Sequence, residues 1–141
     1  MPKHIVEPLN TQLMNTSSLE YFIALVRSCR YYENQYWHNG RSQDNMRQAI
    51  ALERRIDDYV ASCRKLLSAM PAYKPEPAAK AFFDLIENWR LRTREYYHMR
   101  KESKSDPRLL KEILKHCRQM EQQIDTFISE YDKQLHNNAK G

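Results

Sequence analysis

Residues 107–136 read PRLLKEILKHCRQMEQQIDTFISEYDKQLH, and this stretch decides the fold. Its apolar side chains recur at alternating intervals of three and four residues: Leu110, Ile113, Cys117, Met120, Ile124, Phe127 and Tyr131. That spacing places all of them on one face of an α-helix. A stripe of this width must be buried against other helices, so the stretch predicts a long helix within a multi-helix assembly.

Start and stop signals divide the rest of the chain into further helices. Asp106 followed by Pro107 is typical of an N-cap with proline at the first helical position. Gly40 is a typical helix stop, and the proline-rich segment 71–77 cannot be helical. Helices are therefore expected over residues 18–38, 43–70, 78–102 and 107–136.

The short connections between these helices make consecutive helices neighbours. The expected architecture is all-α: an antiparallel up-down-up-down four-helix bundle over residues 16–136, preceded by an extended arm over 1–15 and followed by a frayed tail over 137–141. A three-helix bundle with a mobile N-terminal hairpin is the structural alternative. Two glycines in 141 residues disfavour β-rich folds and exclude glycine-rich nucleotide loops.

The sequence also bears on the compartment. No apolar run near the N-terminus is long enough for a signal peptide, and none elsewhere approaches the ~20 residues of a membrane span. Cys29, Cys63 and Cys117 form no CxxC pair, so we expect reduced thiols and a cytoplasmic protein without a membrane partner.

Two motifs of helical enzymes occur, and each has a simpler explanation. Glu95 and His98 have the Glu-x-x-His spacing of di-iron bundles, but helical geometry turns both away from the apolar face. Arg92 and His98, with five residues between them, have the spacing of HEPN ribonucleases, which chance supplies in a chain this rich in arginine. We expect no catalytic residues and no cofactor, and a HEPN-like ribonuclease is the third alternative for the function.

Some polar side chains fall on the apolar stripes. Cys29, Glu53 and Cys117 are expected at one level of the bundle, and thiolates and carboxylates can both ligate zinc. No histidine is close to them in this arrangement, and buried cysteine commonly serves packing alone. Packing is therefore the favoured interpretation, and no metal site is expected.

Glu33 and Glu53 also occupy apolar registers. An unpaired buried carboxylate costs several kcal/mol, so each needs a partner or a proton. In the expected bundle Arg100 lies at the level of Glu33, and Arg92 lies near Glu53. We predict buried ion pairs between these residues, with acid–base chemistry of the carboxylates as the functional alternative.

Positive charge is concentrated between residues 90 and 118. This segment has ten basic and four acidic side chains, a local charge of +6 in a chain whose net charge is +5. Cations in the N-terminal half of the last helix oppose its macrodipole, so an anionic partner explains them better than helix stability does. The candidate anion-binding residues are Arg94, Arg100, Lys101, Lys104, Arg108, Lys111, Lys115 and Arg118.

Aromatic side chains gather at the ends of the first and third expected helices, which a bundle would bring to one pole. The candidate contact residues are Tyr31, Tyr32, Tyr36, Trp37, Tyr96 and Tyr97, of which Tyr31 and Tyr97 are expected to be exposed. This aromatic, basic pole favours a non-enzymatic interaction or accessory module that binds a protein partner or a second copy of the chain. A nucleic-acid-binding bundle that grips phosphates with the basic segment is the alternative.

Overall fold

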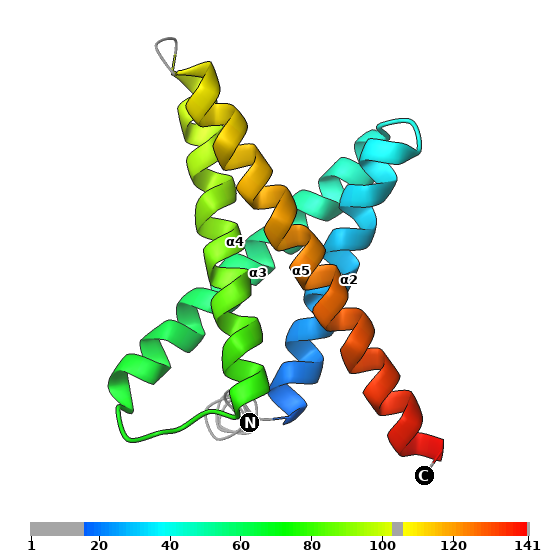
Figure 1. Ribbon diagram of the computed structural model, residues 1–141, viewed down its shortest axis with the longest axis vertical. Helices are drawn as coiled ribbons and strands as arrows, with labels where there is room; N and C mark the ends of the chain where they lie inside the picture. Colours follow the sequence, from blue (N-terminus) through cyan, green and yellow to red (C-terminus); the bar gives the residue numbers. More distant parts are fainter. Residues whose placement is uncertain (1–15, 103–105, 141) are drawn as a thin grey trace, which may run out of the picture. The chain divides into compact units, whose positions relative to one another are not determined.

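The computed structural model describes residues 16–102 and 106–140, and these ranges are all-α (Figure 1). Four helices make up these ranges: α2 (Thr16–His38), α3 (Gln43–Ala69), α4 (Pro77–Lys101) and α5 (Pro107–Lys140). The predicted all-α class and its four helices are confirmed. The predicted N-terminal arm lies outside the described residues.

The C-terminal end of α5 differs from the prediction. The helix continues to Lys140, whereas we expected it to end at His136 and to be followed by a frayed tail. No proline or glycine interrupts the chain before Gly141, and Ala139 and Lys140 have high helix propensity. The prediction of the helix end is therefore wrong, because these residues outweigh the two asparagines before them.

Side-chain caps begin α3 and α5 at the predicted positions. Ser42 Oγ accepts a hydrogen bond from the backbone N–H of Asp44 at 3.2 Å. Asp106 Oδ1 accepts one from the backbone N–H of Arg108 at 2.9 Å. The first N–H groups of a helix have no partner inside it, so these two bonds define where the helices begin.

The turn between α2 and α3 depends on Gly40. Its φ is +93°, and Arg41 follows with a φ of +55°. A left-handed backbone costs free energy for a residue with a Cβ. Glycine at position 40 avoids that cost, so only Arg41 bears it. The Arg41 guanidinium lies 5.0 Å from the centroid of the Trp37 ring, a contact that helps to hold this residue in its strained conformation.

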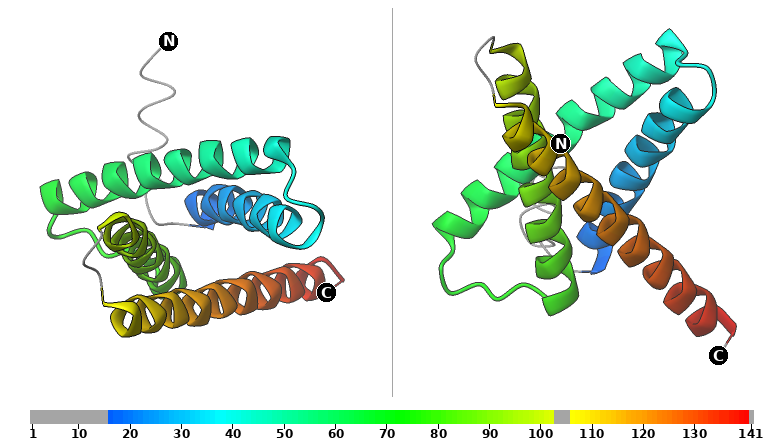
Figure 2. Two further views of the ribbon diagram at one scale, coloured as in Figure 1. Left: turned by 90° about the horizontal axis from the view of Figure 1, so that it is seen from above. Right: turned by 45° about the horizontal axis from the view of Figure 1, so that its top comes forward.

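The chain divides into two compact units, residues 1–80 and 81–141. In the first unit, α2 and α3 run antiparallel on either side of the turn at residues 39–42 (Figures 1 and 2). The second unit contains α5 and α4 without its first turn. A single domain over residues 16–136 stays a prediction.

Aromatic and aliphatic side chains form the core of the first unit. The rings of Phe22 and Tyr59 lie 4.7 Å apart between their centroids. The buried side chains are Leu19, Phe22, Ile23, Leu25, Val26 and Cys29 of α2 and Ala49, Ile56, Tyr59, Val60 and Cys63 of α3. Helical spacing alone predicts narrower stripes: Leu19, Phe22, Val26, Cys29 and Tyr36 on α2, and Ala49, Ile56, Val60, Cys63, Leu67 and Met70 on α3 and its C-cap. Ile23, Leu25 and Tyr59 flank these stripes, so the buried face is wider than the prediction.

In the second unit, α4 and α5 pack antiparallel. Phe82 stacks on Phe127 with ring centroids 4.7 Å apart. Further along α4, Trp89 Nε1 donates a hydrogen bond to Glu121 Oε2 at 3.2 Å. Residue numbers thus rise along α4 as they fall along α5. Phe127 belongs to the predicted apolar stripe of α5, so this stripe faces α4.

Truncation of Ile56 tests the core of the first unit. Ile56 is 0% exposed, and Ile50 on the same helix is 42% exposed. We expect Ile56→Ala to lower the free energy of unfolding by about 2–5 kcal/mol, because it leaves a cavity. Urea denaturation followed by circular dichroism measures this change. Ile50→Ala is the matched control, and an equal loss in both variants would contradict the packing of α3 described above.

Substitution of Gly40 tests the turn. An added Cβ would meet no atom within 4 Å, so the cost of Gly40→Ala comes from the backbone alone. We expect a loss of about 1–2 kcal/mol in the free energy of unfolding. An unchanged denaturation midpoint would show that residue 40 does not hold a positive φ in solution.

Candidate functional site

Exposed basic side chains flank the connection between α4 and α5. Because residues 102–106 join the two helices, the C-terminal end of α4 and the N-terminal end of α5 lie at the same end of this hairpin (Figure 1). Of the predicted anion-binding residues, Lys104 lies outside the described residues. The others are exposed and are here named the basic cluster: Arg94, Arg100, Lys101, Arg108, Lys111, Lys115 and Arg118.

Members of the basic cluster differ in their partners. Arg118 forms an ion pair with Glu121 at 2.8 Å. Within the described ranges of the chain, Arg108, Lys111 and Lys115 form no ion pair. These three therefore present full positive charges to solvent from the first half of α5.

Two arginines of the same segment do not belong to this surface. Arg90 is buried, and its guanidinium lies 5.3 Å from the centroid of the Trp89 ring. Arg92 is half-buried and contacts Glu95 and His116. The exposed charge is therefore smaller than the sequence count of +6 indicated.

A hydrogen-bonded group of side chains joins α4 to α5 at Arg92. Arg92 Nε donates to His116 Nδ1 at 3.1 Å, and its Nη1 donates to Glu95. His116 Nδ1 thus carries no proton in this arrangement. His98 lies 3.2 Å from Glu102 instead. The HEPN-like spacing does not bring Arg92 and His98 to a common partner.

The predicted aromatic contact residues occur as edge-to-face pairs of neighbours. Tyr31 and Tyr97 are exposed, as predicted, and so is Trp37. The pairs are Tyr31–Tyr32, Tyr36–Trp37 and Tyr96–Tyr97, with ring centroids 5.2, 5.2 and 5.3 Å apart. The residues of α2 and α4 belong to different units, so a shared aromatic pole stays a prediction.

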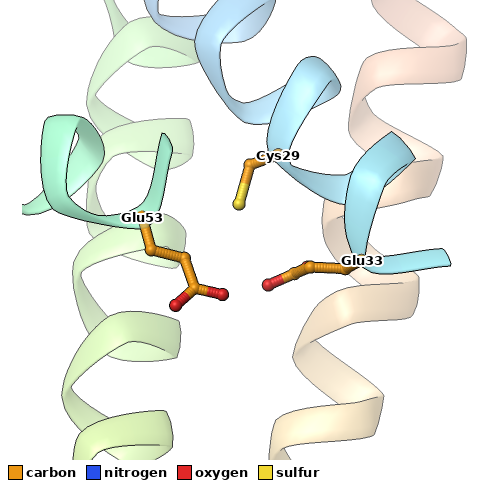
Figure 3. Close-up of side chains that lie close together, drawn as sticks. All are labelled: Cys29, Glu33 and Glu53. Carbon is orange, nitrogen blue, oxygen red and sulfur yellow. The ribbon is translucent and has the colours of Figure 1, made fainter. Parts of the chain in front are cut away.

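A second group of polar side chains lies inside the α2–α3 hairpin. Cys29 and Glu33 are four residues apart on α2, and Glu53 points towards them from α3 (Figure 3). One atom from each, the Cys29 Sγ and a carboxylate oxygen of each glutamate, lie within 4.8 Å of one another. Cys29 is fully buried, and only 14% of the Glu33 side chain is exposed. We name these three residues the buried cluster.

Burial and two neighbouring side chains determine whether Glu33 is protonated. Burial raises the pKa of its carboxyl to about 8; the hydrogen bond that the protonated carboxyl donates to Glu53 and the negative charge of Glu53 act in the same direction. Arg30 Nη1 lies 3.0 Å from Glu33 Oε1 and lowers the pKa, but not enough to cancel the effect of burial. Near neutral pH the folded protein therefore keeps a proton on Glu33.

The observed partners differ from the predicted ion pairs. Glu33 pairs with Arg30 and Arg92 pairs with Glu95, each on its own helix. Arg100 is exposed, which contradicts its predicted burial: it lies in the last turn of α4, where a long side chain extends into water. The pairings of Glu33 with Arg100 and Glu53 with Arg92 would join the two units and stay predictions.

The buried cluster also differs from the predicted group. Cys117 belongs to the second unit, where Thr93 Oγ1 lies 3.9 Å from its Sγ. Within the first unit, Glu33 lies beside Cys29 and Glu53, and the placement of Cys117 at their level stays a prediction. The spacing of Cys29 and Glu33, one helical turn apart, was the signal that could have identified this group from the sequence.

Comparison with known proteins gives no indication of the function. No family model, no curated protein and no solved structure matches the chain. None of the described helices has an apolar stretch long enough to cross a membrane. Within the described residues, the basic cluster and the buried cluster are the two candidate binding sites.

The raised pKa of Glu33 predicts a dependence of stability on pH. Between about pH 4.5 and 8, the folded protein keeps a proton on Glu33 that the unfolded chain has released. The free energy of unfolding should therefore fall as the pH rises through this range, by at most about 1.4 kcal/mol per pH unit. Urea denaturation in the presence of a chelator at several pH values measures the slope.

Glu33→Gln should remove this fall, because the amide does not titrate. Glu20→Gln changes an exposed carboxylate of the same helix and is the matched control, which should keep the wild-type slope. The assignment fails if the wild type and Glu33→Gln show the same slope.

Proposed function

We propose that this protein is a non-enzymatic binding module that holds an acidic surface of a partner protein against the basic cluster of its α4–α5 hairpin. The observation that carries the proposal is the exposure of Arg108, Lys111 and Lys115 along the first half of α5, without an ion pair in the described ranges. Like charges on adjacent turns repel one another, and an anionic partner would relieve that repulsion.

The macrodipole of α5 supports the same proposal. Cations near the N-terminus of a helix destabilise it by a few tenths to about 1 kcal/mol each. Arg108 lies in the first turn of α5 and Lys111 in the next, so both oppose the dipole. Helix stability therefore does not explain why cations occupy these positions, whereas binding of an anionic partner does.

Side chains beside these cations favour a protein over a polyphosphate. Glu112, Glu102 and Asp106 are exposed among them, and each would repel a phosphate backbone. Tyr97 is 48% exposed and Leu109 44% exposed, in the turns that flank the connection between α4 and α5. A mixed surface of tyrosine, leucine and both charges is typical of protein interfaces.

Nucleic acid is the second candidate partner. The basic residues at 108, 111, 115 and 118 recur along one side of α5, as contacts to successive phosphates would require, and exposed Tyr97 could stack on a base. Each phosphate contact adds about −0.7 to −0.9 to the slope of log affinity against log salt. A salt series with a labelled single-stranded oligonucleotide therefore separates the two candidates.

Charge reversal tests the proposal. We expect Lys111→Glu together with Lys115→Glu to abolish the capture of partner proteins in affinity purification with mass spectrometry, because the surface changes sign. The matched control is Arg54→Glu with Lys65→Glu, which reverses two exposed cations of α3 and should leave capture unchanged.

The proposal also predicts weak binding to the oligonucleotide at physiological salt, no tighter than the ~10⁻⁴–10⁻⁶ M of non-specific association. Tighter binding with a steep salt slope that shrinks in the Lys111→Glu, Lys115→Glu variant would replace the protein partner with nucleic acid. Equal capture by the two double variants would reject the basic cluster as the binding surface.

A further inference from the structure

We propose that Cys29, Glu33 and Glu53 form a binding site for a single zinc ion inside the α2–α3 hairpin. The site shares no residue with the basic cluster, so each proposal can be tested without the other. It rests on the convergence of one cysteine and two glutamate side chains from two helices onto one point (Figure 3).

The distances fit a cation of this size. Because the three ligand atoms lie within 4.8 Å of one another, a single point exists from which none is farther than about 2.8 Å. Zinc bonds are about 2.3 Å to sulfur and about 2.0–2.2 Å to carboxylate oxygen. Each ligand atom would have to move less than about 1 Å towards the ion to reach these bond lengths. Rotation of the two glutamate side chains can supply that movement.

The helices hold the three ligands in place from opposite sides. Cys29 and Glu33 lie on successive turns of α2, the spacing that brings two side chains to one metal ion. Cys29 Sγ lies 3.9 Å from the carbonyl oxygen of Ala49, one turn before Glu53 on α3. The thiol is therefore directed across the hairpin, towards the helix that provides the third ligand.

The charges balance when a divalent cation is added. Zinc binding displaces the protons of the Cys29 thiol and the Glu33 carboxyl into solvent. The resulting thiolate and two carboxylates contribute three negative charges, and zinc contributes two positive ones. Arg30, whose Nη1 lies 3.0 Å from Glu33 Oε1, contributes one more. The occupied site is thus neutral overall, which matters because an unbalanced charge is costly at this depth.

The mixture of donors selects the metal. Calcium and magnesium prefer oxygen ligands alone, whereas a thiolate with carboxylates suits zinc. Three protein ligands leave the fourth tetrahedral position for a water molecule.

Metal titration of the full chain tests the site. Zinc affinity is measured by competition with a chromophoric chelator, and cobalt is used as a spectroscopic probe because a bound thiolate produces a charge-transfer band. We expect one equivalent of zinc and such a band in the wild type. Cys29→Ser, Glu33→Gln and Glu53→Gln should each lower zinc affinity about tenfold or more.

The other two cysteines provide the matched control. Cys63 and Cys117 are also buried but lie outside the cluster, so Cys63→Ser with Cys117→Ser leaves Cys29 as the remaining thiol. This variant should keep both the affinity and the cobalt band. A cluster variant that loses its helical circular dichroism signal is unfolded and tests nothing. In that case the cobalt band of the Cys63→Ser, Cys117→Ser variant shows whether Cys29 is the thiolate ligand.

Three results would overturn the proposal. The first is a wild type that binds no zinc, and the second is a cobalt band that is absent from the Cys63→Ser, Cys117→Ser variant. The third is an affinity that survives all three cluster substitutions but is lost in His98→Gln with His116→Gln, which would assign the ion to surface histidines.

Discussion

Each helix of this chain has to bury an apolar stripe, and every polar side chain within a stripe must then find a partner inside the protein. Two such side chains, Glu33 and Glu53, meet in the α2–α3 hairpin, where both face the same buried thiol. Their proximity couples packing to electrostatics: the hairpin can bury its stripe only if a proton, a guanidinium or a metal ion balances the carboxylates. The packing of the first unit therefore depends on what occupies this point.

Periodicity and caps were sufficient to predict the helices. The three-four spacing on α5, the Asp106 cap and the Gly40 turn depend on contacts within a few residues, and such contacts are visible in a sequence. The wider buried face was harder to predict, because Ile23, Leu25 and Tyr59 flank the stripe rather than lie on it. The end of α5 was missed for a similar reason, since two asparagines alone do not terminate a helix.

The candidate sites show where sequence reasoning stops. Exposure of Tyr31, Tyr97 and the cations of α5 followed from helical geometry, which turns residues away from a stripe by a known angle. The partners of buried charges did not follow, because they depend on which side chains of a neighbouring helix arrive at the same level. Glu33 contacts Arg30 and Glu53. Helical periodicity does not show whether a buried carboxylate will pair with such a neighbour or with an arginine farther along the chain.

The two tryptophans have opposite environments, and this provides a separate optical signal for each unit. Trp89 of α4 is fully buried and hydrogen-bonded to Glu121, so its fluorescence emission belongs at short wavelength and is shielded from quenchers in solution. Trp37 of α2 is exposed beside Arg41, so it emits at longer wavelength and is open to the same quenchers. A single emission spectrum therefore distinguishes melting of the α4–α5 hairpin from a change at the α2–α3 turn.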